Sequence, residues 1–226
     1  AVLEDLYLPF RPKRRTRAMI AREKGLEPLA NALITQLPSI DPRNAAHAYL
    51  SPEKGVESIE DALAGARDII AEMVNEDAGV RQSMRDLFSR EGVIQSVMVK
   101  GKETEGAKYR DYFQWREPIA KTPSHRLLAM FRGENEGILK LAVFPPEEKA
   151  LNLLQPRFVR ARNQASEQVS EALADSYKRL LGPSMETEIR QIAKEKADGE
   201  AIHVFALNVR ELLMAAPLGQ KAVMAI

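Results

Sequence analysis

The sequence predicts an all-α, multihelical protein with at most one small β-hairpin, in an irregular middle region. Three observations support this fold class. Apolar residues recur every three or four positions over most of the chain, which is the period of one buried helix face. Pairs that start or stop helices, such as Asp41-Pro42 and Gly182-Pro183, separate these stretches. Strand-like residues cluster only between residues 92 and 146.

Four helices are predicted before residue 92. In each of them apolar residues share one face, and a proline or a capping residue marks at least one end. The predicted helices run from Leu26 to Leu37, from Pro42 to Leu50, from about Val56 to Asn75, and from about Val80 to Phe88.

Three more helices are predicted after Pro145 and Pro146. The first runs from near Phe158 to Leu181, where Gly182 and Pro183 are expected to end it. The second spans roughly residues 185–196, and the third begins near residue 198 and ends at Pro217. The third is expected to bury four residues, namely Ile202, Phe205, Val209 and Leu212.

The middle region is predicted to be irregular because glycines interrupt its β-branched stretches. Pro123-Ser124 is a good helix start, with Ser124 expected as the N-cap residue. Residues 132–134 are expected to form a tight turn with an ion pair. The best domain boundary is near Pro145. It gives a helical domain with a basic loop over residues 1–145, a central helical segment over 146–217, and the first strand of a further domain over 218–226.

The charge is unevenly distributed, although the formal net charge is only +1. Residues 11–24 hold seven lysines and arginines against one acid, Glu23. Apolar residues make up 45% of the chain and charged residues 29%, as in ordinary globular proteins, and no apolar run is long enough to span a membrane. A basic stretch on a mildly acidic body indicates a local role for that stretch.

The sequence offers little for catalysis or metal binding. Cysteine is absent, and the three histidines lie far apart at His47, His125 and His203, so no metal site and no cofactor are expected. Ser124, His125 and Asp111 lack the spacing of a nucleophile and its base, and structural roles explain them better. We therefore expect no enzymatic activity, and the lack of cysteine fits a reducing cytoplasm.

The basic segment is where a functional interpretation competes with a structural one. Four cations beside Pro12 are the candidate nucleic-acid-binding residues: Lys13, Arg14, Arg15 and Arg17. They could neutralise phosphates and give salt-sensitive binding that is independent of base sequence. They could equally pair with acids of another domain, or form a solvated surface tract. All three alternatives stay open at this point.

Several longer motifs are distributed over the chain from residue 5 to residue 217: Asp5 to Arg17, Ile20 to Ala30, Ala62 to Glu72, Asp111 to Phe113, Pro123 to Arg126, Arg132 to Glu134, and Ala201 to Pro217. Together they resemble the N-terminal and central region of the Tex family of transcription accessory proteins.

The resemblance implies a cytoplasmic protein tied to transcription, with a multihelical region followed by an RNase H-like domain, helix-hairpin-helix elements and an OB-fold RNA-binding domain. It also implies that this chain stops at the first strand of the RNase H-like domain, so the main RNA-binding domain lies outside it. The expected role is a non-catalytic helical scaffold of a factor that binds nucleic acid (RNA or DNA), with RNA polymerase or other transcription machinery as further partners. The alternative is a protein-interaction module that docks other domains or RNA polymerase without touching nucleic acid.

Overall fold

The computed structural model describes residues 15–216 and the single positions 5, 7, 219, 222 and 224. Lys13 and Arg14 lie outside the described residues, as does most of the strand predicted over residues 218–226. The chain forms two compact units. The first comprises residues 1–95, 116–120 and 142–190, and the second comprises residues 96–115, 121–141 and 191–226. The domain boundary predicted near Pro145 stays a prediction.

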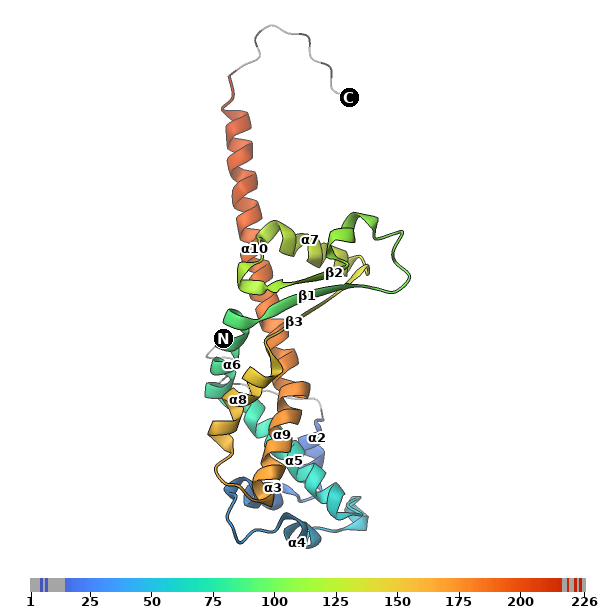
Figure 1. Cartoon of the computed structure of the whole chain (residues 1–226), viewed down its shortest axis with the longest axis vertical. Helices are drawn as coiled ribbons and strands as arrows, with labels where there is room; N and C mark the ends of the chain where they lie inside the picture. The colour runs from blue at the N-terminus through green and yellow to red at the C-terminus, as the bar shows by residue number, and fades with distance from the viewer. Residues whose placement is uncertain are drawn as a thin grey trace. The chain divides into compact units, whose positions relative to one another are not determined.

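The structure confirms the predicted fold class, since helices dominate the described chain (Figure 1). The helices are α2 (Arg17–Glu23), α3 (Glu27–Thr35), α4 (Pro42–His47), α5 (Ile59–Glu76), α6 (Ala78–Glu91), α7 (Ser124–Asn135), α8 (Glu147–Phe158), α9 (Gln164–Ser176) and α10 (Gly182–Leu213). The strands are β1 (Val93–Met98), β2 (Gln114–Pro118) and β3 (Leu139–Phe144). Short 3-10 turns cover Pro52–Lys54, Ala107–Tyr112 and Ile119–Lys121, and a π-helical turn covers Tyr177–Leu181.

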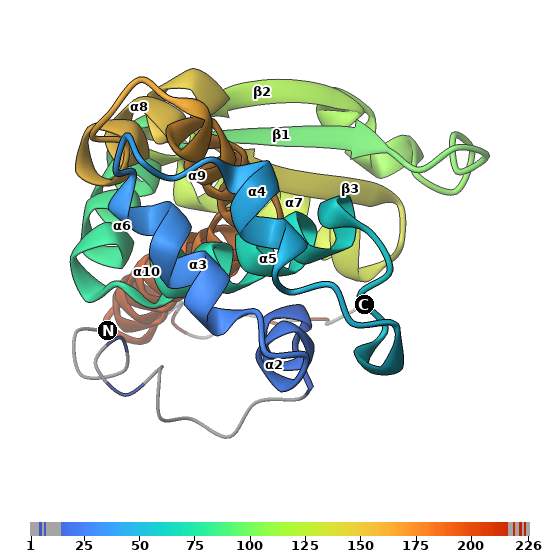
Figure 2. The ribbon, with the colours of Figure 1, turned by 90° about the horizontal axis from the view of Figure 1, so that it is seen from below.

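Helix α5 forms the centre of the first unit, and α2, α3, α4 and α9 pack around it (Figure 2). Its start is fixed by a capping box, in which Ser58 and Asp61 each accept a hydrogen bond from the other's backbone N–H. The apolar stripe predicted for this helix is buried through Leu63, Ala66 and Ile70. The helix predicted over 42–50 also begins as expected, because the Asp41 side chain accepts from two backbone N–H groups.

The middle region holds a three-stranded antiparallel sheet in the order β2-β1-β3, where the sequence predicted at most a hairpin. The hydrogen bond from Met98 N to Phe113 O joins the end of β1 to the start of β2. The bond from Val99 N to Ile138 O joins the same end of β1 to the start of β3. The sequence indicated strand-like residues at β1 and β3 but not at β2, because Gln114–Pro118 contains no β-branched residue and ends in a proline.

Helix α7 corrects two further expectations. It begins at Ser124 as predicted, but Pro123 occupies the N-cap position and Ser124 makes no capping bond. Residues 132–134 lie inside the helix instead of forming a turn. Gly133 is needed there for packing, because a Cβ would lie 2.6 Å from the Leu139 side chain of β3 and 3.3 Å from Tyr109.

Gly182 and Pro183 do not end a helix, contrary to the prediction, and α9 continues into α10 as one ribbon (Figure 1). The π turn explains this. The backbone N–H of Gly182 donates to Tyr177 O, five residues back, so the backbone widens just before the proline. Pro183 then stands at the start of α10, where a missing N–H is tolerated. The two helices predicted over 185–196 and from residue 198 onward are also a single helix.

The second half of α10 is not buried as predicted. Ile202 is 68% exposed, Phe205 69% and Leu212 76%, and Val209 is half-buried. The apolar period on this helix was identified correctly, but no described part of the second unit covers it.

Candidate nucleic-acid interface

The two described cations of the predicted site lie at the start of α2. Arg15 and Arg17 are both exposed, and Thr16 between them is the N-cap residue of the helix. The Thr16 hydroxyl accepts a hydrogen bond from Met19 N at 3.1 Å, which is why the helix begins at this point. The sequence placed these cations in a loop or a helix start, and the described part is a helix start.

Glu72 of α5 anchors this helix start to the first unit. Its carboxylate is 6% exposed; it accepts a hydrogen bond from the Thr16 hydroxyl at 2.9 Å and pairs with the Arg22 guanidinium at 2.6 Å. A buried carboxylate is tolerated only when such partners compensate for its lost hydration. The anchor therefore holds Arg15 and Arg17 in a defined place on the surface.

The same region of α5 lets α2 come close. A Cβ at Gly65 would lie 2.3 Å from the Leu26 side chain and 3.4 Å from Ala21. Glycine thus makes room for Leu26, which is fully buried just after α2. Sequence reasoning missed both Gly65 and Glu72, because neither has a partner within its own helix.

The electrostatic environment of the two cations is mixed in sign. Arg15 pairs with Glu23 at 2.6 Å, with both side chains more than half exposed. Such a pair is worth about 0.2–1 kcal/mol, so a phosphate can compete with it. Arg17 lines a shallow groove of about 220 Å³ with Lys24, Asp61 and Asp68.

Asp68 is the acid of this groove whose pKa is raised. Burial raises the pKa of its carboxyl group, and this outweighs the lowering by the positive charges of Arg179, which pairs with it at 2.7 Å, and of Arg17. Two described cations of the predicted site therefore lie near acids of their own unit. Acids of the same unit thus neutralise part of the positive charge that a phosphate or an acid of another domain would otherwise meet.

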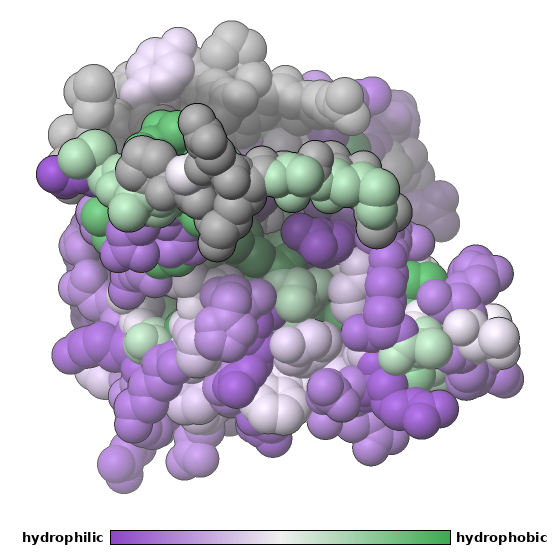
Figure 3. All heavy atoms as spheres, turned by 90° about the horizontal axis from the view of Figure 1, so that it is seen from above, coloured by the Kyte–Doolittle hydropathy of each residue, from purple (hydrophilic) through white to green (hydrophobic). Residues whose placement is uncertain are grey.

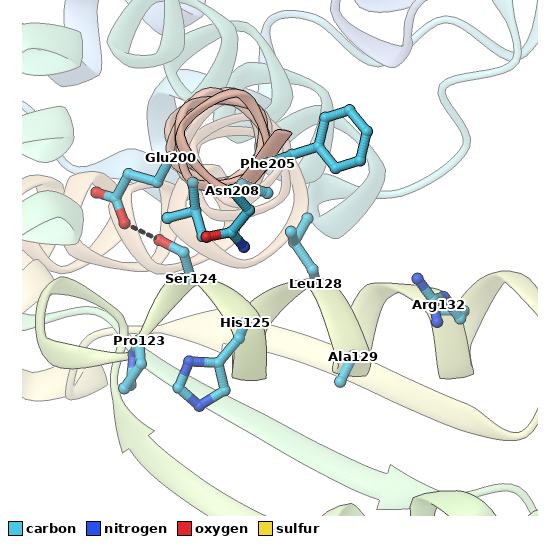
Figure 4. Close-up of a pocket in the computed structure, with 11 residues that line it drawn as sticks. Pro123, Ser124, His125, Leu128, Ala129, Arg132, Glu200, Phe205 and Asn208 are labelled. Carbon is cyan, nitrogen blue, oxygen red and sulfur yellow. Dashed lines mark hydrogen bonds between the residues drawn. The ribbon is translucent and has the colours of Figure 1, made fainter. Parts of the chain in front are cut away.

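A larger cavity of about 730 Å³ lies in the second unit, where α7 runs across α10 (Figure 4). Its apolar lining includes Leu128 and Ala129 of α7 and Val204 and Phe205 of α10. The Ser124 hydroxyl donates to the Glu200 carboxylate across the corner, as the dashed line in Figure 4 shows. His125 and Arg132 are exposed at its edge.

The histidines and acidic residues in the described part of the chain are dispersed. Among residues 15–216 and the five single positions, no three histidines or acids come together as metal ligands. In the same part of the chain, no helix is both long and apolar enough to cross a membrane.

Comparison with known proteins adds a family relationship to this geometry. A family model described as "Tex central region-like" matches residues 37–205. The Escherichia coli protein YhgF is 43% identical over 234 residues, which cover 99% of this chain and 30% of that protein. The transcriptional accessory protein Tex of Neisseria gonorrhoeae is 41% identical over 96% of this chain and 29% of its own length. The human S1 RNA-binding domain-containing protein 1 is 28% identical over 99% of this chain and 24% of its own length. The chain thus spans less than a third of the length of these relatives.

Proposed function

Because this chain belongs to the Tex family, we propose that it is a non-catalytic helical scaffold within a transcription accessory protein that associates with nucleic acid. Its cations at residues 13–17 contact phosphates, while the longer protein carries the principal RNA-binding function. RNA polymerase is a further partner of that longer protein, and the cytoplasm is its compartment.

The names of the relatives support the transcription and nucleic-acid parts of this proposal. One is a transcriptional accessory protein and another contains an S1 RNA-binding domain. Both match nearly all of this chain, so the region accompanies these activities in proteins of very different organisms. Family relationship alone does not say which residues touch nucleic acid.

The observation that carries the phosphate contact is the anchored start of α2. Arg15 and Arg17 project from a helix that Glu72 fixes to α5, so their positions are largely set before a ligand arrives. Preorganised cations lose less conformational entropy on binding than cations of a free tail. Phosphate contacts of this kind position a protein on nucleic acid without reading its sequence.

The scaffold role is supported by how the polar groups of the first unit are used. The anchor at Glu72, the Ser58–Asp61 capping box and the ion pair of Arg179 with Asp68 all hold helices together. Such groups are committed to packing and are poorly placed to act on a substrate. A catalytic site instead needs several groups converging on one position.

The test measures binding of the 226-residue chain to single-stranded RNA, single-stranded DNA and duplex DNA over a range of salt concentrations. The variant carries Lys13→Glu, Arg14→Glu, Arg15→Glu and Arg17→Glu. We expect weaker binding and a log–log salt slope smaller by about 0.7 for each phosphate of a single strand that the variant no longer neutralises.

The control variant has the same change in net charge on four exposed cations elsewhere: Arg43→Glu, Lys121→Glu, Lys140→Glu and Lys194→Glu. It should keep the native salt slope if the basic segment is the site. Equal weakening in the two variants would mean that overall charge matters and not this segment. No salt-dependent binding by the native chain would favour the protein-interaction alternative.

A further inference from the structure

The second half of α10 carries an apolar stripe that the other described residues leave largely exposed, here called the α10 stripe: Ile202, Phe205, Val209 and Leu212. These residues follow one another at steps of three, four and three, which is the a/d spacing of helices that pack side by side. Three of them are more than two-thirds exposed. Seen from the end at which α10 finishes, apolar side chains lie at the surface among polar ones (Figure 3).

The stripe adjoins the cavity between α7 and α10 through one shared residue. Phe205 belongs to the stripe and also lines the cavity, and Figure 4 shows its ring extending from α10 on the side of Leu128 and Arg132. Ala129 and Ala201 line the same corner. Small side chains at these positions let another backbone approach closely, while the Phe205 ring offers a large apolar anchor.

The charges around the stripe restrict what can cover it. The positions that flank the stripe on α10 are uncharged: Ala201, Ala206, Asn208 and Leu213. In a pair of helices, charged residues at such positions normally select the partner. Because these positions are uncharged on α10, a partner helix whose own flanking residues are uncharged and apolar fits best. Arg132 and His125 at the cavity edge favour an acidic side chain at one end of the occupant.

The short length of the α10 stripe indicates where that occupant comes from. The stripe spans only about two heptads, which is too short for a stable coiled coil between separate chains. A helix tethered in the same polypeptide avoids this difficulty, because its effective concentration is high. The matched relatives are more than three times as long as this chain, so most of their residues lie outside the shared region.

We propose that an amphipathic helix from another region of the full-length Tex protein packs along the α10 stripe, covers Phe205 and closes the cavity against α7. The α10 stripe is then an internal docking surface. This inference is independent of nucleic-acid binding, which the charge-reversal variants test separately.

The first experiment uses the full-length Escherichia coli relative. The residue aligned with Phe205 is replaced by the photoreactive p-benzoylphenylalanine, and cross-linked peptides are identified by mass spectrometry. We expect a cross-link within one chain, to a segment outside the region matched by residues 1–226. The control places the same group at the position aligned with Lys194, an exposed residue of α10 outside both the stripe and the cavity. That position should not give this cross-link.

The second experiment compares stability in the two contexts. Phe205→Asp should leave the Tm of the 226-residue chain unchanged, because the side chain is already 69% exposed there. The aligned substitution should lower the Tm of the full-length relative by roughly 2–4 °C. A cross-link to a second copy or to a different protein, or equal effects of the substitution in both contexts, would overturn the proposal.

Discussion

The Thr16 hydroxyl donates to the Glu72 carboxylate at 2.9 Å and so joins two positions that lie 56 residues apart in the chain. Because Thr16 is also the N-cap residue of α2, one side chain both starts this helix and attaches it to α5. The orientation of the start of α2, with Arg15 and Arg17, therefore depends on the buried Glu72.

Glu72→Ala should destabilise the chain by about 2 kcal/mol, because Thr16 loses its partner in a part-buried position and Arg22 keeps only the longer pair with Glu27 at 3.5 Å. Urea unfolding measures this destabilisation, and hydrogen exchange should show it concentrated in α2. Glu23→Gln, which removes only the exposed pair with Arg15, serves as the control and should cost less than about 1 kcal/mol. Equal costs for the two variants would mean that Glu72 is not an anchor.

A second prediction concerns the buried network around Asp5. Its carboxylate is 5% exposed and accepts hydrogen bonds from Arg81 at 2.6 Å and Arg85 at 2.8 Å. Burial raises the pKa of Asp5, but the hydrogen bonds and charges of the two arginines outweigh it and hold the pKa below its ordinary value. The ionised form is therefore more favourable in the folded chain than in the unfolded chain.

The stabilisation from Asp5 is fully present above about pH 4 and is lost as the pH falls through the lowered folded-state pKa. Asp5→Asn should cost about 3 kcal/mol at neutral pH and should make the acid limb of the stability profile shallower. Urea unfolding between about pH 6 and pH 2 measures both effects. An unchanged acid limb in Asp5→Asn would mean that the two arginines do not hold Asp5 in its ionised form.

Two glycines of α10 give a matched pair of substitutions. At Gly182 a Cβ would lie 2.7 Å from the Tyr177 carbonyl oxygen and 3.4 Å from the Phe144 ring, so Gly182→Ala should destabilise by about 1–3 kcal/mol. At Gly199 no atom lies within 4 Å of the added carbon, and Gly199→Ala should stabilise by about 0.5–1 kcal/mol through helix propensity. Thermal unfolding of both variants measures these two changes in stability. A stabilising Gly182→Ala would argue against the π turn.

Tyr177 provides a prediction at alkaline pH. Burial, with a smaller contribution from the negative charge of Glu147, raises the pKa of the Tyr177 hydroxyl to about 12. Because the folded chain holds this proton more tightly than the unfolded chain, stability should fall as the pH rises from about 10 towards 12. Ultraviolet titration should show a late component that is smaller in Tyr177→Phe, while the pKa of Tyr109, which burial also raises, keeps its contribution. An unchanged titration curve would count against this assignment.

Local signals were sufficient for most of the fold. Asp41 before Pro42 fixes a helix start within a few residues of sequence, and the apolar stripe from Ile59 to Val74 marks the length of α5; both were found from the sequence. Strand β2 and the continuity of α9 with α10 were not found. Strand β2 has no β-branched residue to signal it, and the continuity depends on the π turn, which places Pro183 where it is tolerated.

The candidate site was predictable only in part. Clustered cations beside Pro12 mark this segment in the sequence, and Arg15 and Arg17 are exposed in the structure. Glu72 sits among apolar residues of α5, so nothing local marks it as their anchor. The same limit applies to Phe205, whose spacing predicted an apolar face but not whether another part of the chain covers it.

The π turn at Tyr177–Leu181 has a consequence for how this helix can evolve. A π turn holds one residue more than the regular helix would, so deleting one residue there can restore a regular helix and leave the faces of the helix downstream in place. Deleting a residue from the regular helix just after the turn would instead rotate everything downstream by about 100° about the helix axis. Met185 and Ile189, now buried, would then leave the core, and Glu188 would leave Arg85. A one-residue deletion should therefore be tolerated better inside this turn than in the regular helix that follows it.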